Sequence, residues 1–126
     1  MLTLFALIMA LGMIVDDAAV MRIRLRDILE TKYKVVAEAS NGQEALELYD
    51  EHRPDFVTLD ITMPQVNGIE ALEKLMHKHP DARVVIVSAV GQKRMVFDAI
   101  SKGAKDFIIK PFDGDRVILA IDRLFE

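Results

Sequence analysis

At 126 residues, the chain is long enough to bury a real core in one domain and leaves little length for a second domain. The absence of cysteine excludes disulfides, thiolate metal sites and a cysteine nucleophile, and a hydrophobic content of 52% argues against a disordered chain. The net charge of −4 argues against a nucleic-acid partner, because proteins that bind the phosphate backbone usually carry a basic excess.

The first fifteen residues carry no charged side chain, and only Thr3 and Gly12 interrupt their apolar run. A membrane-spanning helix needs about 20 apolar residues, and the run also lacks the basic flank of a signal peptide. We expect residues 10–15 to form a buried first strand. Residues 1–9 are then an apolar extension of a domain that spans residues 10–126. Alternatively, this extension could serve as a membrane anchor or as a contact between copies of the chain. We expect a cytoplasmic monomer.

Short β-branched runs alternate with segments of helical spacing along the rest of the chain. The strands are predicted at Met13–Val15, Lys34–Ala37, Asp55–Leu59, Arg83–Val87 and Phe107–Ile109. The helices are predicted at about 21–29, 42–51, 68–77, 92–102 and 114–125. The central strands are almost continuously apolar, which is typical of parallel strands covered on both faces. Five such units predict an α/β fold, a doubly wound five-stranded parallel sheet.

Polar side chains stand where four of the predicted strands end. Asp16 and Asp17 follow the first strand, Asp60 ends the third, Ser88 the fourth and Lys110 the fifth. In a doubly wound sheet the functional site lies at the carboxyl ends of the strands. We therefore expect these five side chains to converge on one edge, although Asp16 and Asp17 taken alone are equally consistent with a helix cap.

This set of residue types favours phosphoryl transfer. Three neighbouring carboxylates repel one another unless a cation lies between them, and the preferred cation for oxygen ligands is a hard divalent ion such as Mg²⁺. A carboxylate can then act as the nucleophile and form an aspartyl phosphate. The metal and Lys110 would neutralise the charge on the phosphoryl oxygens, and Ser88 would hydrogen-bond one of them.

Four motifs, in order along the chain, resemble the signature of response-regulator receiver domains, and in particular of the single-domain chemotaxis regulators. They are Ile14–Asp17, Asp60–Pro64 with Asn67-Gly68, Ser88-Ala89 and Gly103–Phe112. The resemblance covers the chain from about Leu11 to its end and implies a flavodoxin-like (βα)5 fold with strand order 2-1-3-4-5.

The resemblance also implies a role for each site residue. Asp60 matches the phosphoacceptor, and Lys110 matches the lysine that contacts the phosphoryl group, in a cis peptide bond with Pro111. Mg²⁺ would be bound by Asp16, Asp17, Asp60 and the carbonyl of Thr62. Ser88 and Phe107 match the hydroxyl and the aromatic ring of the switch. Phe107 stands where tyrosine is frequent, so its ring lacks a hydroxyl.

By this resemblance, the chain is a signalling switch of a two-component system rather than an enzyme, with chemistry limited to its own phosphorylation and dephosphorylation. A histidine kinase would phosphorylate Asp60, and the chain would then change its affinity for an output protein such as a flagellar motor switch component. One alternative is a phosphorelay intermediate. Another is an aspartyl-phosphate hydrolase, which often has a second aspartate where this chain has Thr62. A flavin carrier is the third, although acids stand where it needs a phosphate-binding loop.

Several other charged residues are open to two interpretations. Arg22, Arg24 and Arg26 could form a surface that binds phosphate or a partner, or simply the solvated face of a helix. An output surface or an ordinary solvated surface could equally be formed by Lys93, Arg94, Phe97, Lys105 and Arg116. We expect His77 and His79 to interact with the end of a helix dipole and not to bind a metal.

Overall fold

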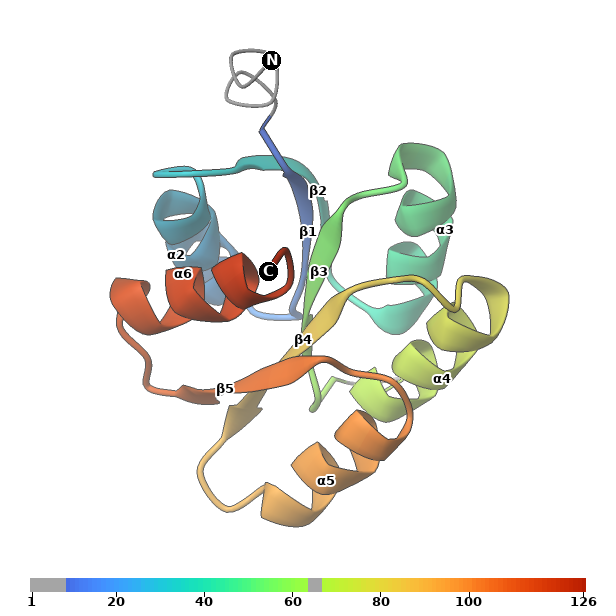
Figure 1. Cartoon of the computed structure of the whole chain (residues 1–126). Coiled ribbons are helices and arrows are strands. Elements are labelled where there is room, and N and C mark those ends of the chain that lie inside the picture. Colours follow the sequence, from blue (N-terminus) through green and yellow to red (C-terminus); the bar gives the residue numbers. More distant parts are fainter. Residues whose placement is uncertain (1–8, 64–66) are drawn as a thin grey trace.

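The computed structural model describes residues 9–63 and 67–126, in which strands and helices alternate strictly (Figure 1). The strands are β1 (Leu11–Val15), β2 (Lys34–Ala39), β3 (Phe56–Asp60), β4 (Val84–Ala89) and β5 (Asp106–Lys110). The helices are α2 (Ala19–Leu29), α3 (Gly42–His52), α4 (Gly68–Lys78), α5 (Lys93–Ser101) and α6 (Gly114–Arg123). All neighbouring strands pair in parallel, in the order β2-β1-β3-β4-β5. The predicted fold is therefore confirmed.

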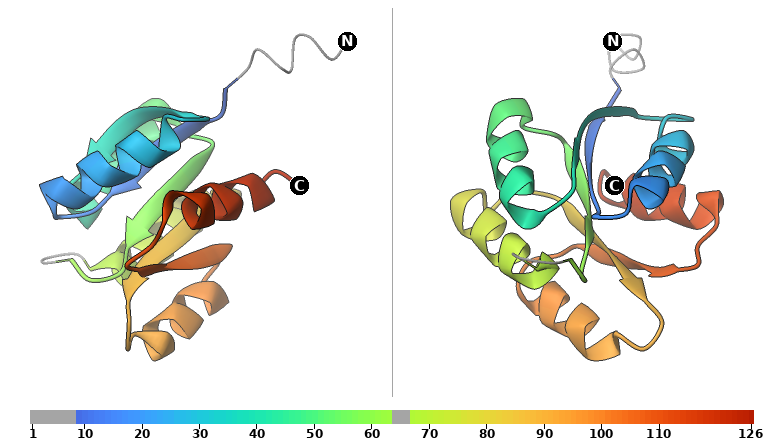
Figure 2. Two further views of the ribbon diagram at one scale, coloured as in Figure 1. Left: turned by 90° about the vertical axis from the view of Figure 1, so that its left-hand side faces the viewer. Right: turned by 180° about the vertical axis from the view of Figure 1, so that it is seen from behind.

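Helices cover both faces of the sheet, α2 and α6 on one side and α3, α4 and α5 on the other (Figures 1 and 2). Under α2 and α6, Leu29 and Ile121 pack in one buried cluster with Phe56 of β3. Under the other three helices, Leu72 and Ala99 belong to a second cluster. The sheet is thus the middle of three layers, and its central strands lie between two apolar cores.

The two-sided cover explains the unbroken apolar runs of the central strands. Every residue of β3 is buried, and so is every residue of β4 except Ala89 at its end. Strands covered on both faces lack the alternation of a half-exposed strand. The edge strand β2 does alternate between buried and more exposed residues, whereas in the other edge strand, β5, only Ile108 is buried. At their carboxyl ends, β2 and β4 extend two residues further than predicted.

Side-chain caps begin three of the helices at the joints that the sequence indicates. Asn41, Asn67 and Asp113 each accept a hydrogen bond, at 2.8–3.0 Å, from the backbone N–H three residues further on. Such caps satisfy one of the free N–H groups at a helix start. They fix where α3, α4 and α6 begin and therefore how the preceding loops leave the sheet.

Parts of two predictions lie outside the described residues. These parts are residues 1–8 of the apolar extension, and Pro64 of the second motif. Of the extension, only Met9 is described, and it is exposed ahead of β1. Within residues 9–63 and 67–126, the helices are all too short or too polar to cross a membrane.

Candidate functional site

Three acidic side chains meet at the carboxyl ends of β1 and β3. Carboxylate oxygens of Asp16, Asp17 and Asp60 all lie within 4.8 Å of one another. Asp16 is 1% exposed and Asp60 is 5% exposed, while Asp17 is exposed to solvent. Buried carboxylates at this separation repel one another strongly. The fold thus holds a concentrated negative charge at this edge of the sheet.

Hydrogen bonds fix both the backbone and the side chain of Asp16, the first residue after β1. Its backbone N–H donates to the carbonyl of Ala39 at 3.0 Å, and its carbonyl accepts from the guanidinium of Arg22 at 2.7 Å. Its Oδ1 accepts from the Ala18 N–H at 2.9 Å, at the start of α2. Oδ2 is buried and has no hydrogen-bond partner among the described residues. Asp16 therefore holds the turn before α2 through one carboxylate oxygen and leaves the other free for the pocket.

Lys110, the last residue of β5, supplies the positive charge of the pocket. Its Nζ lies 3.6 Å from Asp16 Oδ2 and 3.6 Å from Asp60 Oδ1. These distances are longer than a hydrogen bond, so the ammonium attracts both carboxylates without satisfying either. The following bond to Pro111 is cis, as predicted.

Burial and neighbouring charge perturb Asp60. Removal from water, followed by the negative charge of Asp16, raises the pKa of Asp60 to about 6. Lys110 and the N–H of Thr62, which donates to Asp60 Oδ1 at 3.2 Å, act in the opposite direction. Lys110 and the Thr62 N–H therefore offset only part of the effect of burial and of Asp16 on the pKa of Asp60. Three carboxylates and a free buried oxygen suit a hard divalent cation with oxygen ligands.

Ser88 and Phe107 lie on neighbouring strands beside this pocket. Ser88 is fully buried near the end of β4, and its hydroxyl has no hydrogen-bond partner among the described residues. Phe107 is half-buried on β5 and packs against the core under α3, α4 and α5. The carbonyl of Phe107 accepts a hydrogen bond from Arg116 of α6 at 2.7 Å. A free buried hydroxyl is costly, so Ser88 is available for an incoming acceptor.

Gly68 lets α4 begin directly beneath the acidic corner at the end of β3. Its N–H donates to the carbonyl of Ile61 at 2.9 Å. A Cβ atom at this position would lie 2.3 Å from the carbonyl oxygen of Asp60 and 2.6 Å from Ile61 Cα. Because both of these are backbone atoms, they cannot give way cheaply. The absence of a side chain at Gly68 therefore sets the geometry of the loop after Asp60.

The sequence reading missed Gln92. Its Nε2 donates to Thr62 Oγ1, and its Oε1 accepts from the Ala89 N–H at 2.7 Å. Thr62 follows β3 and Gln92 follows β4, so this side chain connects two loops beside the pocket. Apart from its place after Gly91, nothing in the neighbouring sequence indicates this role of Gln92, because its partner Thr62 is distant in the sequence.

The three arginines of α2, Arg22, Arg24 and Arg26, interact with other parts of the chain. Arg22 and Arg26 form ion pairs with Glu38 of β2, at 3.3 and 2.6 Å. Arg24 donates to the carbonyl of Phe112 at 2.8 Å and lies over its ring. These arginines therefore connect α2 to its neighbours, and the interpretation as a phosphate-binding surface is not supported.

Both histidines lie at the end of α4, where the helix-dipole interpretation places them. His77 stands in the last turn and His79 is the C-cap residue. His79 is also 8% exposed, bonds to Asp50 at 2.8 Å and packs on the ring of Tyr49. It therefore connects the end of α4 to α3, a contact that local spacing along the chain does not reveal.

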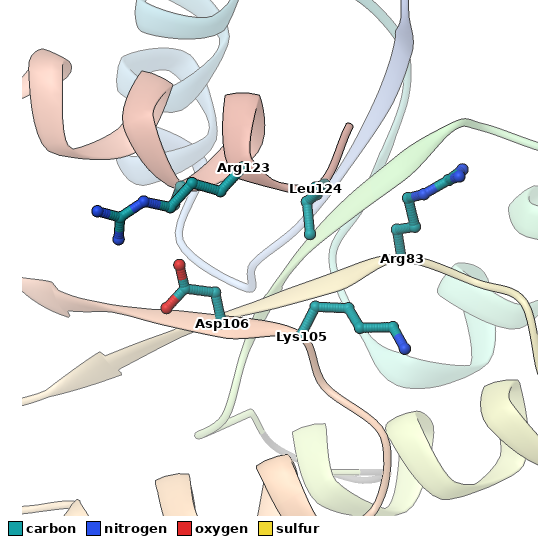
Figure 3. A pocket seen from close by; sticks show the side chains of 6 residues that line it. Arg83, Lys105, Asp106, Arg123 and Leu124 are labelled. Carbon is teal, nitrogen blue, oxygen red and sulfur yellow. The ribbon is translucent and has the colours of Figure 1, made fainter. Parts of the chain in front are cut away.

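A second charged hollow lies between α6 and the residues that begin β4 and β5. Its lining includes Arg83, Lys105, Asp106 and Arg123. Figure 3 shows that Arg83 and Lys105 point away from Arg123, so their charges do not meet at one point. Arg83 also lies over the ring of Phe125. The charged side chains of this hollow therefore do not converge on one point, as those of the acidic pocket do.

The family model for the response regulator receiver domain matches residues 13–122. The chain is 55% identical to the chemotaxis protein CheY of Listeria monocytogenes over 112 residues, which cover 88% of this chain and 94% of the relative. It is 54% identical to CheY of Bacillus subtilis over 112 residues, with 88% and 93% covered.

A solved structure of the CheX–CheY–BeF3–Mg²⁺ complex from Borrelia burgdorferi matches with a TM-score of 0.89 and 37% identity, and 93% of this chain and 90% of that chain are covered. The phosphorelay and hydrolase alternatives are not favoured by these relatives. The chain belongs to the response-regulator receiver family and is a phosphorylation-driven switch of two-component signalling, closely related to the CheY chemotaxis regulators.

Proposed function

We propose that Asp60 is the residue that accepts the phosphoryl group, and that a histidine kinase donates it. The observation that carries this proposal is the position of Asp60: it ends the central strand, lies 3.6 Å from Lys110 and receives the N–H of Thr62. A carboxylate oxygen of Asp60 attacks phosphorus while the bond from phosphorus to the kinase histidine breaks. The bonding pair returns to the imidazole nitrogen, which then takes a proton.

Mg²⁺ is the cofactor that the acidic pocket fits best. Asp16, Asp17, Asp60 and the carbonyl of Thr62 would hold it. The clustered carboxylates and the free Oδ2 of Asp16 support this ligand set. When bound, the ion neutralises charge on the carboxylates and on the phosphoryl oxygens. The related Borrelia structure, by its name, contains Mg²⁺ together with BeF3.

Lys110 and Ser88 are the groups we assign to the phosphoryl oxygens. Lys110 already faces Asp60 across 3.6 Å and carries the charge that a phosphoryl group attracts. Ser88 has a buried hydroxyl whose hydrogen bond is unmade among the described residues. A phosphoryl group on Asp60 offers Ser88 the acceptor it lacks, which gives the phosphorylated state a contact that the free state does not have.

This new contact is the origin of the conformational switch in our proposal. As Ser88 moves toward the phosphoryl group, Phe107 turns into the space that Ser88 leaves. Phe107 also lines an apolar hollow with Val90, Phe97 and Ile109, which are 76%, 63% and 40% exposed. A movement of the Phe107 ring therefore changes the shape of this hollow.

The output partner binds over that hollow, between α5 and β5. Exposed apolar side chains gathered in one hollow are typical of a protein-binding surface. Lys93, whose ammonium lies 5.9 Å from the centre of the Phe97 ring, adds a positive charge to its rim. A flagellar motor switch component is the partner we expect from the relation to chemotaxis regulators. Pull-down of the phosphorylated chain with motor-switch protein, against a histidine phosphotransfer protein, tests this choice.

The phosphorylation chemistry is tested by intact mass spectrometry after incubation with acetyl phosphate, with and without Mg²⁺. We expect one phosphoryl group on the wild type with Mg²⁺ and none on Asp60→Asn. The matched control is Asp27→Asn, which removes an exposed carboxylate of α2 and should label like the wild type. A labelled Asp60→Asn, or an unlabelled wild type with Mg²⁺, would contradict the proposal.

A further inference from the structure

The loops that follow β3 and β4 are joined by one side chain beside the phosphorylation pocket. Gln92 donates from Nε2 to the Thr62 hydroxyl and accepts at Oε1 from the Ala89 N–H at 2.7 Å. The Ala89 N–H can only donate, so it must face the amide oxygen and the amide NH₂ must face Thr62. Both ends of the amide are therefore used. We name this Thr62–Gln92–Ala89 connection the strap.

The strap is anchored close to the reacting group at both ends. Thr62 donates its backbone N–H to Asp60 Oδ1 at 3.2 Å, so its position is tied to the phosphoacceptor. Ala89 is the residue directly after Ser88. Asp60 is 5% exposed, whereas Thr62, two residues later, is exposed at the pocket side of the strap.

Gln92 makes this connection at the expense of its own helix. It is the N-cap residue of α5, yet its side chain makes no capping hydrogen bond to that helix. A side chain at an N-cap ordinarily satisfies a free N–H of the first turn. Here the amide contacts the neighbouring loops instead, with its Nε2 also 3.9 Å from Met95 Sδ. The amide of Gln92 is thus used to join the loops after β3 and β4, with one weak contact to the first turn of its own helix.

We propose that Gln92 is a positioning residue that holds Thr62 over the pocket mouth and thereby sets how long the phosphoryl group survives. This inference rests on the proposed phosphorylation of Asp60. Hydrolysis requires a water oxygen to bond to phosphorus as the bond to the Asp60 oxygen breaks. The bonding pair returns to the carboxylate, and the protons of the water leave with inorganic phosphate. The water must approach opposite the Asp60 oxygen, from the mouth, and the strap hinders that approach.

The test compares substitutions that keep size and remove hydrogen bonds. Gln92→Met and Thr62→Val retain bulk but break the strap, whereas Thr62→Ser retains the hydroxyl. Each protein is phosphorylated with acetyl phosphate and Mg²⁺, separated from the reagent, and followed by the loss of the phosphoryl group over time. We expect the first two to lose it about fivefold faster than the wild type, the factor expected for one hydrogen bond. Thr62→Ser should decay at the wild-type rate.

The double variant separates positioning from general loosening. If Gln92 acts only through Thr62, Gln92→Met with Thr62→Val should decay no faster than either single variant, because both remove the same interaction. Gln43→Met is the matched control, since it removes the hydrogen bond of an exposed glutamine on α3 to Glu47, remote from the strap. The midpoint of thermal unfolding and the Mg²⁺ affinity should be unchanged in Gln92→Met and Gln43→Met.

Each result has one meaning. Wild-type lifetimes in Gln92→Met and Thr62→Val, longer lifetimes, or additive effects in the double variant would overturn the role of the strap while the phosphorylation of Asp60 stands. Failure of the wild type itself to take up a phosphoryl group would instead refute the proposed function on which the inference rests.

Discussion

The ammonium of Lys110 lies 3.6 Å from Asp16 Oδ2, the buried oxygen that lacks a hydrogen-bond partner among the described residues. Lys110 therefore interacts with the same carboxylates that would bind the metal. In the proposed function, the lysine and the cation would compete for negative charge while Asp60 is free and would act together once Asp60 carries a phosphoryl group.

Lys110→Met separates these two effects. Loss of the ammonium should tighten Mg²⁺ binding about tenfold, because an attraction over 3.6 Å is removed from the competing cation. It should also slow phosphorylation by acetyl phosphate by at least about tenfold, because charge on the phosphoryl oxygens is no longer neutralised. Calorimetric Mg²⁺ titration and intact mass measure the two quantities. Lys105→Met, an exposed lysine before β5, is the control, and an unchanged Mg²⁺ affinity in Lys110→Met would disprove the competition.

Asp60→Asn should stabilise the metal-free protein at neutral pH. The pKa of Asp60 in the folded chain is raised to about 6, so the folded state binds its proton more tightly than the unfolded state does. Stability due to this group is then present below the unfolded pKa of about 4 and is lost as the pH rises to about 6. Above pH 6 the variant should be more stable by roughly 2–3 kcal/mol.

The measurement is urea unfolding of both proteins in EDTA between pH 4 and pH 8. The difference between them should shrink toward the acid end of this range, which isolates Asp60 from other titrating groups. A difference that is independent of pH would show that the carboxylate carries no strain in the folded pocket.

Gly68→Ala should destabilise the fold by roughly 2–4 kcal/mol, because overpacking against backbone cannot relax as overpacking against a side chain can. The new Cβ would lie 2.3 Å from the Asp60 carbonyl oxygen. Gly114→Ala is the matched control at the first residue of α6, where a Cβ meets only Ile28 side-chain atoms at 3.7 Å. That variant should be stable to within about 1 kcal/mol of the wild type. Equal stabilities of the two variants, by urea unfolding, would refute the close approach.

The two tyrosines should not ionise at their ordinary pKa of about 10 while the chain is folded. Burial, and the hydrogen bond to Asp122, raise the pKa of Tyr33, and burial raises the pKa of Tyr49. Tyrosinate absorbance should therefore appear only as alkali unfolds the protein, together with the loss of circular dichroism. A tyrosinate signal near pH 10 in a folded chain would contradict this, and Tyr33→Phe assigns any early signal to one residue.

The local sequence pattern was sufficient to predict the strands and helices. The buried strands are recognisable as apolar runs, as around Leu59, and the helix starts are marked by cap residues such as Asn41 and Asn67. It was less accurate at strand ends, because partly buried edge positions such as Glu38 do not look like strand. The convergence of Asp16, Asp60 and Lys110 was predictable because the carboxyl ends of parallel strands share one edge.

Contacts between distant segments were not predictable from the sequence. His79 pairs with Asp50, and Gln92 pairs with Thr62, across separations of 29 and 30 residues. A histidine near a helix end and a glutamine before a helix both look like ordinary surface until the loops are placed. The partners depend on how helices sit on the sheet, which spacing along the chain does not encode.

The acidic pocket draws its side chains from β1, β3 and β5, with Ser88 added from β4. Because Asp16 follows β1 and Lys110 ends β5, a chain emerging from the ribosome has no working pocket until all five strands have been synthesised and have paired. Phosphorylation thus also reports completed folding, and truncated or misfolded copies would stay silent in the signalling pathway rather than transmit a false message.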